Sequence, residues 1–236
     1  MIRVMKAEEL ALVQGWTDTR RALVRWQRHP LKVLRPWLLG ALAVAVVLLG
    51  VVWIVATLST GEPSDASFPG ITAPEGLDDF AFVLYRNGLV LALHALACVA
   101  GFMAGSSLPT AAGDYTGLWR KVHDKAGPLA IGFVMLATLF SLSTQAYALG
   151  HGASTLSAEL QVPRGLLLIA LLPHALPELF ALFLPLAAWT IASRRGAWDE
   201  LLAATFVTVA IAVPVLVTAA AVETWVAPRL LLALAG

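Results

Sequence analysis

Long apolar runs separated by short polar stretches are the main feature of the chain. Five of these runs reach the length of about 20 residues that a helix needs to cross the hydrocarbon core of a membrane. They cover residues 36–58, 84–105, 128–149, 164–191 and 201–226. None alternates polar and apolar residues as a barrel strand does, and an unpaired backbone group in lipid is costly. The pattern therefore predicts an all-α fold, a polytopic transmembrane helix bundle with about five spans.

The polar stretches divide the chain into three expected parts. Residues 1–35 mix basic side chains with leucine, valine and tryptophan, which suits an amphipathic helix along the cytoplasmic membrane surface. This segment is either a basic anchor that fixes topology or a docking helix for a partner. The bundle covers residues 36–228, and residues 229–236 form a short external tail. The loop over residues 61–76 is rich in proline, glycine and acidic residues, so we expect an irregular cap there.

Lysine and arginine are distributed unevenly between the two sides of the expected bundle. Thirteen of the sixteen lie before the first run, after the second or after the fourth. The loop over residues 59–81, on the opposite side, carries five acidic residues and no basic one. Because basic loops stay in the cytoplasm, we expect a cell inner-membrane protein with a cytoplasmic amino terminus and an external carboxyl terminus. The first run has no convincing cleavage site and is interpreted as an uncleaved signal anchor.

Composition agrees with a membrane protein and excludes several other classes. Hydrophobic residues make up 59% and charged residues 13% of the 236 residues, and the mean hydropathy is +0.79. A soluble domain carries about 25% charged residues, so the lipid bilayer is the first expected partner. The net charge of +1 gives no reason to expect nucleic-acid binding. Cys98 is the only cysteine, which excludes a disulfide framework and a thiolate metal site.

The fourth run contains residues that are expensive inside a membrane. Pro173 and Pro177 each remove a backbone donor, so the sequence predicts a fourth span that is kinked or broken by proline. His174 and Glu178 are four residues apart, and on a continuous helix they share one face and can pair. A charged side chain at the bilayer centre costs about 2.5–3.5 kcal/mol on insertion scales, and such residues usually face the bundle interior and mark function.

Further residues extend this candidate site. His94 lies at about the depth of His174 in the second run and is a candidate midplane partner. Glu223, near the external end of the last run, is expected to pair with one of three arginines: Arg86, Arg164 or Arg229. We favour a structural hydrogen-bond cluster over a metal site, because too few ligands lie at metal-binding spacing.

Other motifs are either absent or concern packing. The sequence has no HExxH and no GxSxG motif, so protease and serine-hydrolase chemistry is excluded, and we expect no enzymatic activity, no metal and no cofactor. Gly101 and Gly105 form a GxxxG motif in the second run, which permits close helix packing. Packing within the chain is the preferred interpretation, and packing between two copies is the alternative.

Three segments together resemble the stage II sporulation protein M family. Residues 173–181, Pro-His-Ala-Leu-Pro-Glu-Leu-Phe-Ala, are similar to its intramembrane signature Pro-His-Gly-x-x-Glu-Leu-Pro-Ala. Residues 219–228, which contain Glu223, Trp225 and Pro228, resemble the closing stretch of the family. Arg86-Asn87-Gly88 is a fainter match to an Asn-Asn pair that precedes a long apolar helix.

The resemblance implies a non-enzymatic role. In spore-forming bacteria the namesake is a polytopic membrane protein that works with peptidoglycan-degrading partners as a scaffold. The positions that match imply functional roles for Pro173, His174, Glu178 and Glu223, whereas Ala175 replaces the usual glycine.

Two interpretations of function follow from these observations. The first is a non-enzymatic membrane scaffold or complex subunit linked to remodelling of the cell envelope, with membrane or envelope proteins or a second copy as partner. The second is a small transporter or channel in which Glu178 and His174 bind a proton, an ion or a polar solute. Histidine and carboxylate groups within the membrane are typical of proton pathways.

Overall fold

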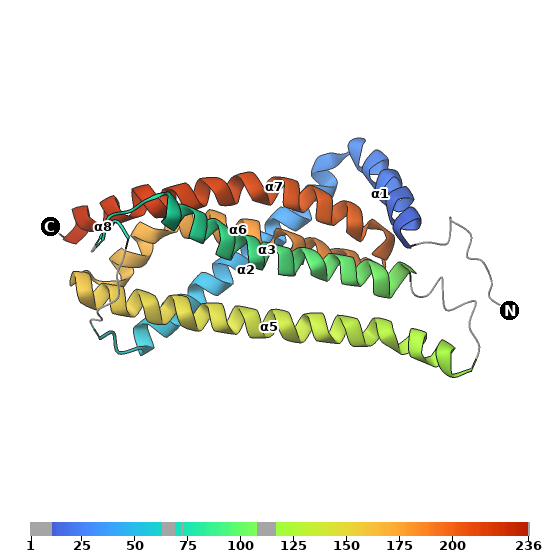
Figure 1. Cartoon of the computed structure of the whole chain (residues 1–236), viewed down its shortest axis with the longest axis horizontal. Helices are drawn as coiled ribbons and strands as arrows, with labels where there is room; N and C mark the ends of the chain where they lie inside the picture. Colours follow the sequence, from blue (N-terminus) through green and yellow to red (C-terminus); the bar gives the residue numbers. More distant parts are fainter. Residues whose placement is uncertain (1–10, 63–68, 72, 108–116, 236) are drawn as a thin grey trace. The chain divides into compact units, whose positions relative to one another are not determined.

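Helices make up nearly all of the described structure. The computed structural model describes residues 11–62, 69–71, 73–107 and 117–235 (Figure 1). Within these ranges no strand is formed, and the only bridge is an isolated one between Pro69 and Ala73. The predicted all-α fold is therefore confirmed.

Among the described residues, five helical segments are long and apolar enough to cross a membrane. They are Pro30–Leu58, Leu77–Ser106, Ile131–Leu160, Arg164–Arg195 and Trp198–Leu234. The helices that carry them are α2 (Pro30–Leu58), α3 (Leu77–Phe102), α5 (Leu118–Leu160), α6 (Arg164–Arg195) and α7 (Leu201–Ala221). The protein is therefore a multi-pass membrane protein.

Shorter elements flank these helices. Helix α1 (Ala11–Gln27) precedes α2, and α8 (Ala227–Ala235) follows the last long helix. A 3₁₀ turn, η3 (Trp198–Glu200), leads into α7. Two π-helical turns, η2 (Met103–Ser107) and η4 (Val222–Val226), follow α3 and α7.

Each of the five spans differs from its expected bounds at one end or both, and the largest differences are at the ends of the third and fifth spans. The third span ends at Leu160, although the apolar run ends at residue 149. Hydroxyl groups beyond residue 149 are bonded to carbonyls, with Ser154 Oγ donating to Ser59 O at 3.0 Å and Ser157 Oγ to Val162 O at 2.7 Å. A satisfied hydroxyl group allows an apolar helix to continue. At the carboxyl end, α8 makes residues 229–235 helical where a short tail was expected.

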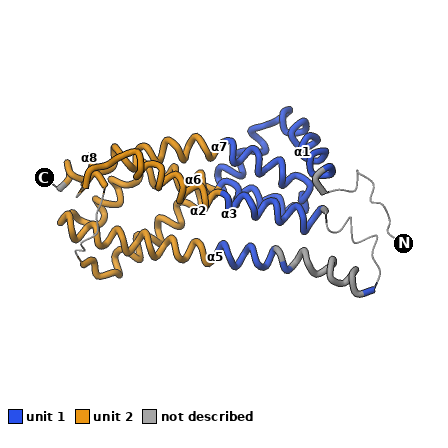
Figure 2. Tube along the Cα trace, in the orientation of Figure 1, with its two compact units in different colours: residues 1–40, 92–138, 184–210 blue, residues 41–91, 139–183, 211–236 orange. Residues whose placement is uncertain are grey.

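The chain divides into two compact units, and each long helix contributes one part to each unit (Figure 2). Unit 1 comprises Met1–Gly40, Ala92–Thr138 and Leu184–Ala210. Unit 2 comprises Ala41–Leu91, Leu139–Phe183 and Ile211–Gly236.

Polar contacts join α1 to the rest of unit 1. Arg25 Nη2 lies 3.6 Å from Asp199 Oδ2 and 3.2 Å from Glu200 Oε1. Gln14 Nε2 donates a hydrogen bond to Ser106 Oγ at 3.2 Å. The segment predicted to be amphipathic is thus a helix over residues 11–27 and is held at two points along its length.

Glycines permit close packing elsewhere in unit 1. A Cβ atom placed on Gly101 would come within 2.7 Å of Leu201 Cδ1 and 2.8 Å of Trp189 Nε1. A Cβ atom on Gly105 would overlap the side chain of Trp198. The GxxxG motif therefore lies against large side chains of the same chain.

Arg164 joins two helices in unit 2. It is the first residue of α6, and its guanidinium group donates to Thr57 O at 3.2 Å and to Ser59 O at 3.1 Å. These carbonyls belong to the carboxyl end of α2, where the last turn lacks partners within its own helix. Arg164 is therefore used as a helix cap and not as a partner of Glu223.

Helix α6 runs without interruption through Pro173 and Pro177, so the expected break is not formed. A proline removes a single backbone donor, and transmembrane helices tolerate this loss when neighbouring groups compensate for it. Because the helix is continuous, residues four apart within it stay on one face.

Candidate functional site

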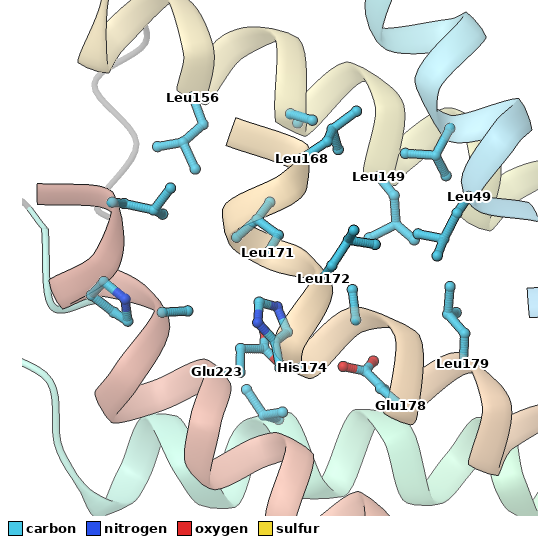
Figure 3. Close-up of a pocket in the computed structure, with 18 of the residues that line it drawn as sticks. Leu49, Leu149, Leu156, Leu168, Leu171, Leu172, His174, Glu178, Leu179 and Glu223 are labelled. Atoms are coloured by element: carbon cyan, nitrogen blue, oxygen red, sulfur yellow. The ribbon is translucent and has the colours of Figure 1, made fainter. Parts of the chain in front are cut away.

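Unit 2 contains a cavity of about 750 Å³. Its wall is formed by α2, α3, α5, α6, η4 and α8, together with Pro69 and Ile71. These two residues belong to the loop that joins α2 to α3, which is called the acidic loop below. Most of the lining side chains are apolar, and leucine is the commonest among them: Leu49, Leu149, Leu156, Leu168, Leu171, Leu172, Leu179 and Leu231. Figure 3 labels seven of these leucines, all except Leu231. The ionisable residues in the wall are Asp79, Arg86, His174, Glu178 and Glu223. The site is therefore an apolar chamber with a charged region.

Helix α6 supplies two of the ionisable groups, His174 and Glu178. Both line the cavity, as their spacing on a continuous helix predicts, whereas Pro173 is exposed and Pro177 is half-buried. His174 is only 7% exposed, and its Nδ1 has no hydrogen-bond partner among the described residues. His174 and Glu178 therefore lie on the same face of α6, but Nδ1 of His174 is not hydrogen-bonded to Glu178.

Glu223 reaches the cavity from the π-helical turn η4. π-Helical turns are rare in proteins overall, but many of those that occur are found at functional sites. Phe80 and Trp225 stack with their ring centroids 5.2 Å apart, which holds this turn against the first turns of α3. Arg86 Nη2 lies 3.8 Å from Glu223 Oε1, so Arg86 is the partner of Glu223 among the three arginines considered.

The carboxyl group of Glu178 lies close enough to Glu223, Arg86 and Asn87 to interact with all three. Figure 3 shows Glu178 near Glu223 and His174, on the opposite side of the cavity from Leu156 and Leu168. The side chain of Arg86 is 51% exposed, whereas that of Glu223 is 27% exposed. The carboxylates are therefore less accessible to solvent than the cation beside them.

Several polar atoms around this region are buried and unpaired. Within the described residues no hydrogen-bond partner of good geometry is found for His174 Nδ1, Glu223 Oε2, Asn87 Nδ2 and Thr224 Oγ1. Each buried unpaired group costs about 1–3 kcal/mol. Native proteins contain only a few such groups. Among the described residues Glu159, Trp189 and Ser193 also have unpaired buried atoms, but these do not line the cavity.

The remaining candidates lie elsewhere or differ in role. His94 is completely buried and belongs to unit 1, so its meeting with His174 stays a prediction. Arg229 Nη2 lies 3.4 Å from Glu75 Oε1 and so joins α8 to the acidic loop. The described residues contain no group of three or more His, Cys, Asp or Glu side chains that could hold a metal ion.

The three segments singled out from the sequence, residues 86–88, 173–181 and 219–228, each contribute side chains to this cavity. Arg86 comes from the first of them, His174 and Glu178 from the second, and Glu223 and Thr224 from the third. The segments are far apart in sequence, and only the fold brings them together. Asp79 was not singled out from the sequence, because an acidic residue in the first turn of a helix has an ordinary capping role: Asp79 Oδ2 accepts a hydrogen bond from Gly76 N at 2.9 Å.

Comparison of the chain with models of protein families, with curated protein sequences and with solved structures gave no match.

Proposed function

We propose that this protein is a non-enzymatic membrane protein that works as a small transporter and moves protons through Glu178 and His174. The observation that supports this proposal is the cavity in unit 2, with its buried, ionisable and incompletely paired side chains. Ionisable groups within membrane-spanning helices are expensive to keep and usually belong to ion or substrate pathways.

The cavity favours a transporter over the scaffold interpretation that the sequence alone placed first. The cavity is open to the surroundings, because Phe82 and Ile169 in its wall are each 64% exposed, so a ligand can enter it from outside. A space of about 750 Å³ is within the range of small-molecule sites. A purely structural polar cluster would satisfy its own hydrogen bonds, whereas His174 Nδ1 and Glu223 Oε2 remain unpaired among the described residues.

The sidedness of the site follows from the charge rule and is part of the proposal. Unit 2 contains the acidic loop and the carboxyl end of the chain, and both are external if the basic segments are cytoplasmic. We therefore place the cavity in the external half of the cell inner membrane, with the amino terminus in the cytoplasm.

Proton movement in proteoliposomes tests the proposal. Purified protein is reconstituted around a pH-sensitive dye, a potassium diffusion potential is imposed, and the internal pH is followed. We expect proton movement with the natural chain and at least a tenfold lower rate with Glu178→Gln. Glu75→Gln is the matched control, because Glu75 lies outside the cavity wall and pairs with Arg229. Equal rates in the natural chain, both variants and protein-free liposomes would refute the transporter proposal.

A second candidate is a subunit of a membrane complex, and helix α1 favours it. Trp16 is 75% exposed on this helix and Val24 is 54% exposed, while Arg25 anchors it to the η3 turn. An exposed apolar surface on a fixed helix suits either a membrane surface or a protein partner. Cross-linking in native membranes followed by mass spectrometry tests this candidate. A partner at constant ratio that is lost with Trp16→Ser supports it, and recovery of the protein alone or as a homo-oligomer contradicts it.

A further inference from the structure

We propose that the cavity in unit 2 binds a single-chain amphiphile with an ammonium head group. The alkyl chain would lie along the leucine-rich wall and the ammonium group beside Glu178 and Glu223. This inference rests on the proposed transporter function and assigns its substrate class.

The shape and chemistry of the wall argue for an amphiphile over a simple ion. Leucines from α2, α5 and α6 make up much of the cavity wall. Figure 3 shows His174, Glu178 and Glu223 at the end away from Leu156 and Leu168. A hydrated ion gains nothing from such an apolar surface, whereas an alkyl chain is stabilised in proportion to the apolar area that it buries. The volume of about 750 Å³ lies in the range of about 300–1,000 Å³ that is typical of sites for one small ligand.

The polar region has more carboxylates than cations, because Asp79, Glu178 and Glu223 line the cavity with Arg86 as the one arginine among the described residues. Glu178 and Glu223 lie close together, and the cation beside them, Arg86, is 3.8 Å from Glu223 Oε1 and half-exposed. The second oxygen of Glu223, Oε2, is buried without a partner among the described residues. An ionised carboxylate can only accept hydrogen bonds, so this oxygen needs a donor.

His174 provides a second, independent indication of a ligand. Its side chain is more than nine-tenths buried in the cavity wall, and its Nδ1 has no partner within the described part of the chain. An ammonium group has three donors and no acceptor, so it matches the chemistry of a carboxylate oxygen such as Glu223 Oε2 and of a neutral imidazole nitrogen. A carboxylate head group would instead meet two carboxylates of like charge.

Fluorescence quenching by brominated amphiphiles tests the head-group preference. Trp53 lies in the cavity wall, and a bromine atom at the end of an alkyl chain would quench it on contact. The natural chain and Trp53→Phe are placed in lipid nanodiscs. Each is titrated with an alkylammonium, an alkanol and an alkanoate of equal chain length. Saturable quenching that occurs in the natural chain but not in Trp53→Phe measures binding of the amphiphile in the cavity.

We expect the alkylammonium to bind at least tenfold more tightly than the alkanol and the alkanoate to bind most weakly. In the double variant Glu178→Gln/Glu223→Gln, the preference for the alkylammonium over the alkanol should fall at least tenfold. The control variant Glu75→Gln should show the same preference as the natural chain. The head-group series on the natural chain decides the proposal even if the double variant does not fold.

The remaining outcomes separate the two proposals. Equal affinity for ammonium and alkanol, together with proton movement that depends on Glu178, refutes the substrate class and leaves the transporter proposal intact. No saturable quenching by any of the three compounds refutes the substrate class as well. If the proteoliposomes also show no proton movement, the transporter proposal is refuted as well.

Discussion

Removal of the Arg86 guanidinium should destabilise unit 2, because Glu178 and Glu223 then face each other without a nearby cation. At the observed 3.8 Å between Arg86 Nη2 and Glu223 Oε1, an ion pair is worth about 4 kcal/mol at an effective dielectric constant of 20. The Arg86 side chain is 51% exposed, so solvent screening reduces this value to about 1–2 kcal/mol. For a chain of this length that loss lowers Tm by about 2–8 °C.

A double-mutant cycle in one detergent measures the effect. Arg86→Met, Glu223→Gln and the double variant are heated, and the fraction that stays monodisperse on size exclusion gives Tm for each. We expect the double variant to be less destabilised than the sum of the two single variants, with a coupling of about 1 kcal/mol that shrinks as salt is added. Arg229→Met is the matched control, because its pair with Glu75 is more exposed and is expected to contribute less than about 1 kcal/mol. Additive effects within error would refute the proposed pairing.

Two further predictions concern packing and capping. Gly105→Ala should lower Tm by about 2–12 °C, because its new Cβ overlaps Trp198 and overpacking costs about 1–3 kcal/mol. Gly88→Ala should leave Tm unchanged or raise it, since nothing lies within 4 Å of that position. Equal Tm values for the two variants would show that the close contact does not exist. Arg164→Gln should raise the rate of amide hydrogen exchange in the last turn of α2, because Ser59 O loses a charged hydrogen-bond donor. An unchanged exchange rate in that turn would contradict the capping role of Arg164.

The sequence alone was sufficient for the number and type of the long elements. A membrane-spanning helix buries its backbone within itself, so its length and apolar character are local properties that can be read from one run of residues. The same local argument singled out His174, Glu178 and Glu223, because an ionisable group in an apolar run is costly wherever the helix packs.

Local rules were less reliable where neighbouring elements compensate for a cost. Pro173 and Pro177 predicted a broken helix, yet α6 is continuous. The third apolar run ends at residue 149, yet α5 continues to Leu160, and the hydroxyl groups of Ser154 and Ser157 bond to the carbonyls of Ser59 and Val162. In the third span, hydrogen bonds from these hydroxyl groups to carbonyls outside the helix offset a cost that the local sequence shows in full.

Only the tertiary structure decided the composition of the site. Arg86 had two competitors as the partner of Glu223, and its choice depends on how the start of α3 packs against the π-helical turn η4. The placing of Asn87 beside Glu178 and the apolar chamber along α2, α5 and α6 likewise have no local signal. Apolar side chains gain the same transfer free energy from lipid as from one another. Helix pairing in a membrane therefore depends on shape and on a few polar contacts between distant segments, and the pattern along one run does not encode it.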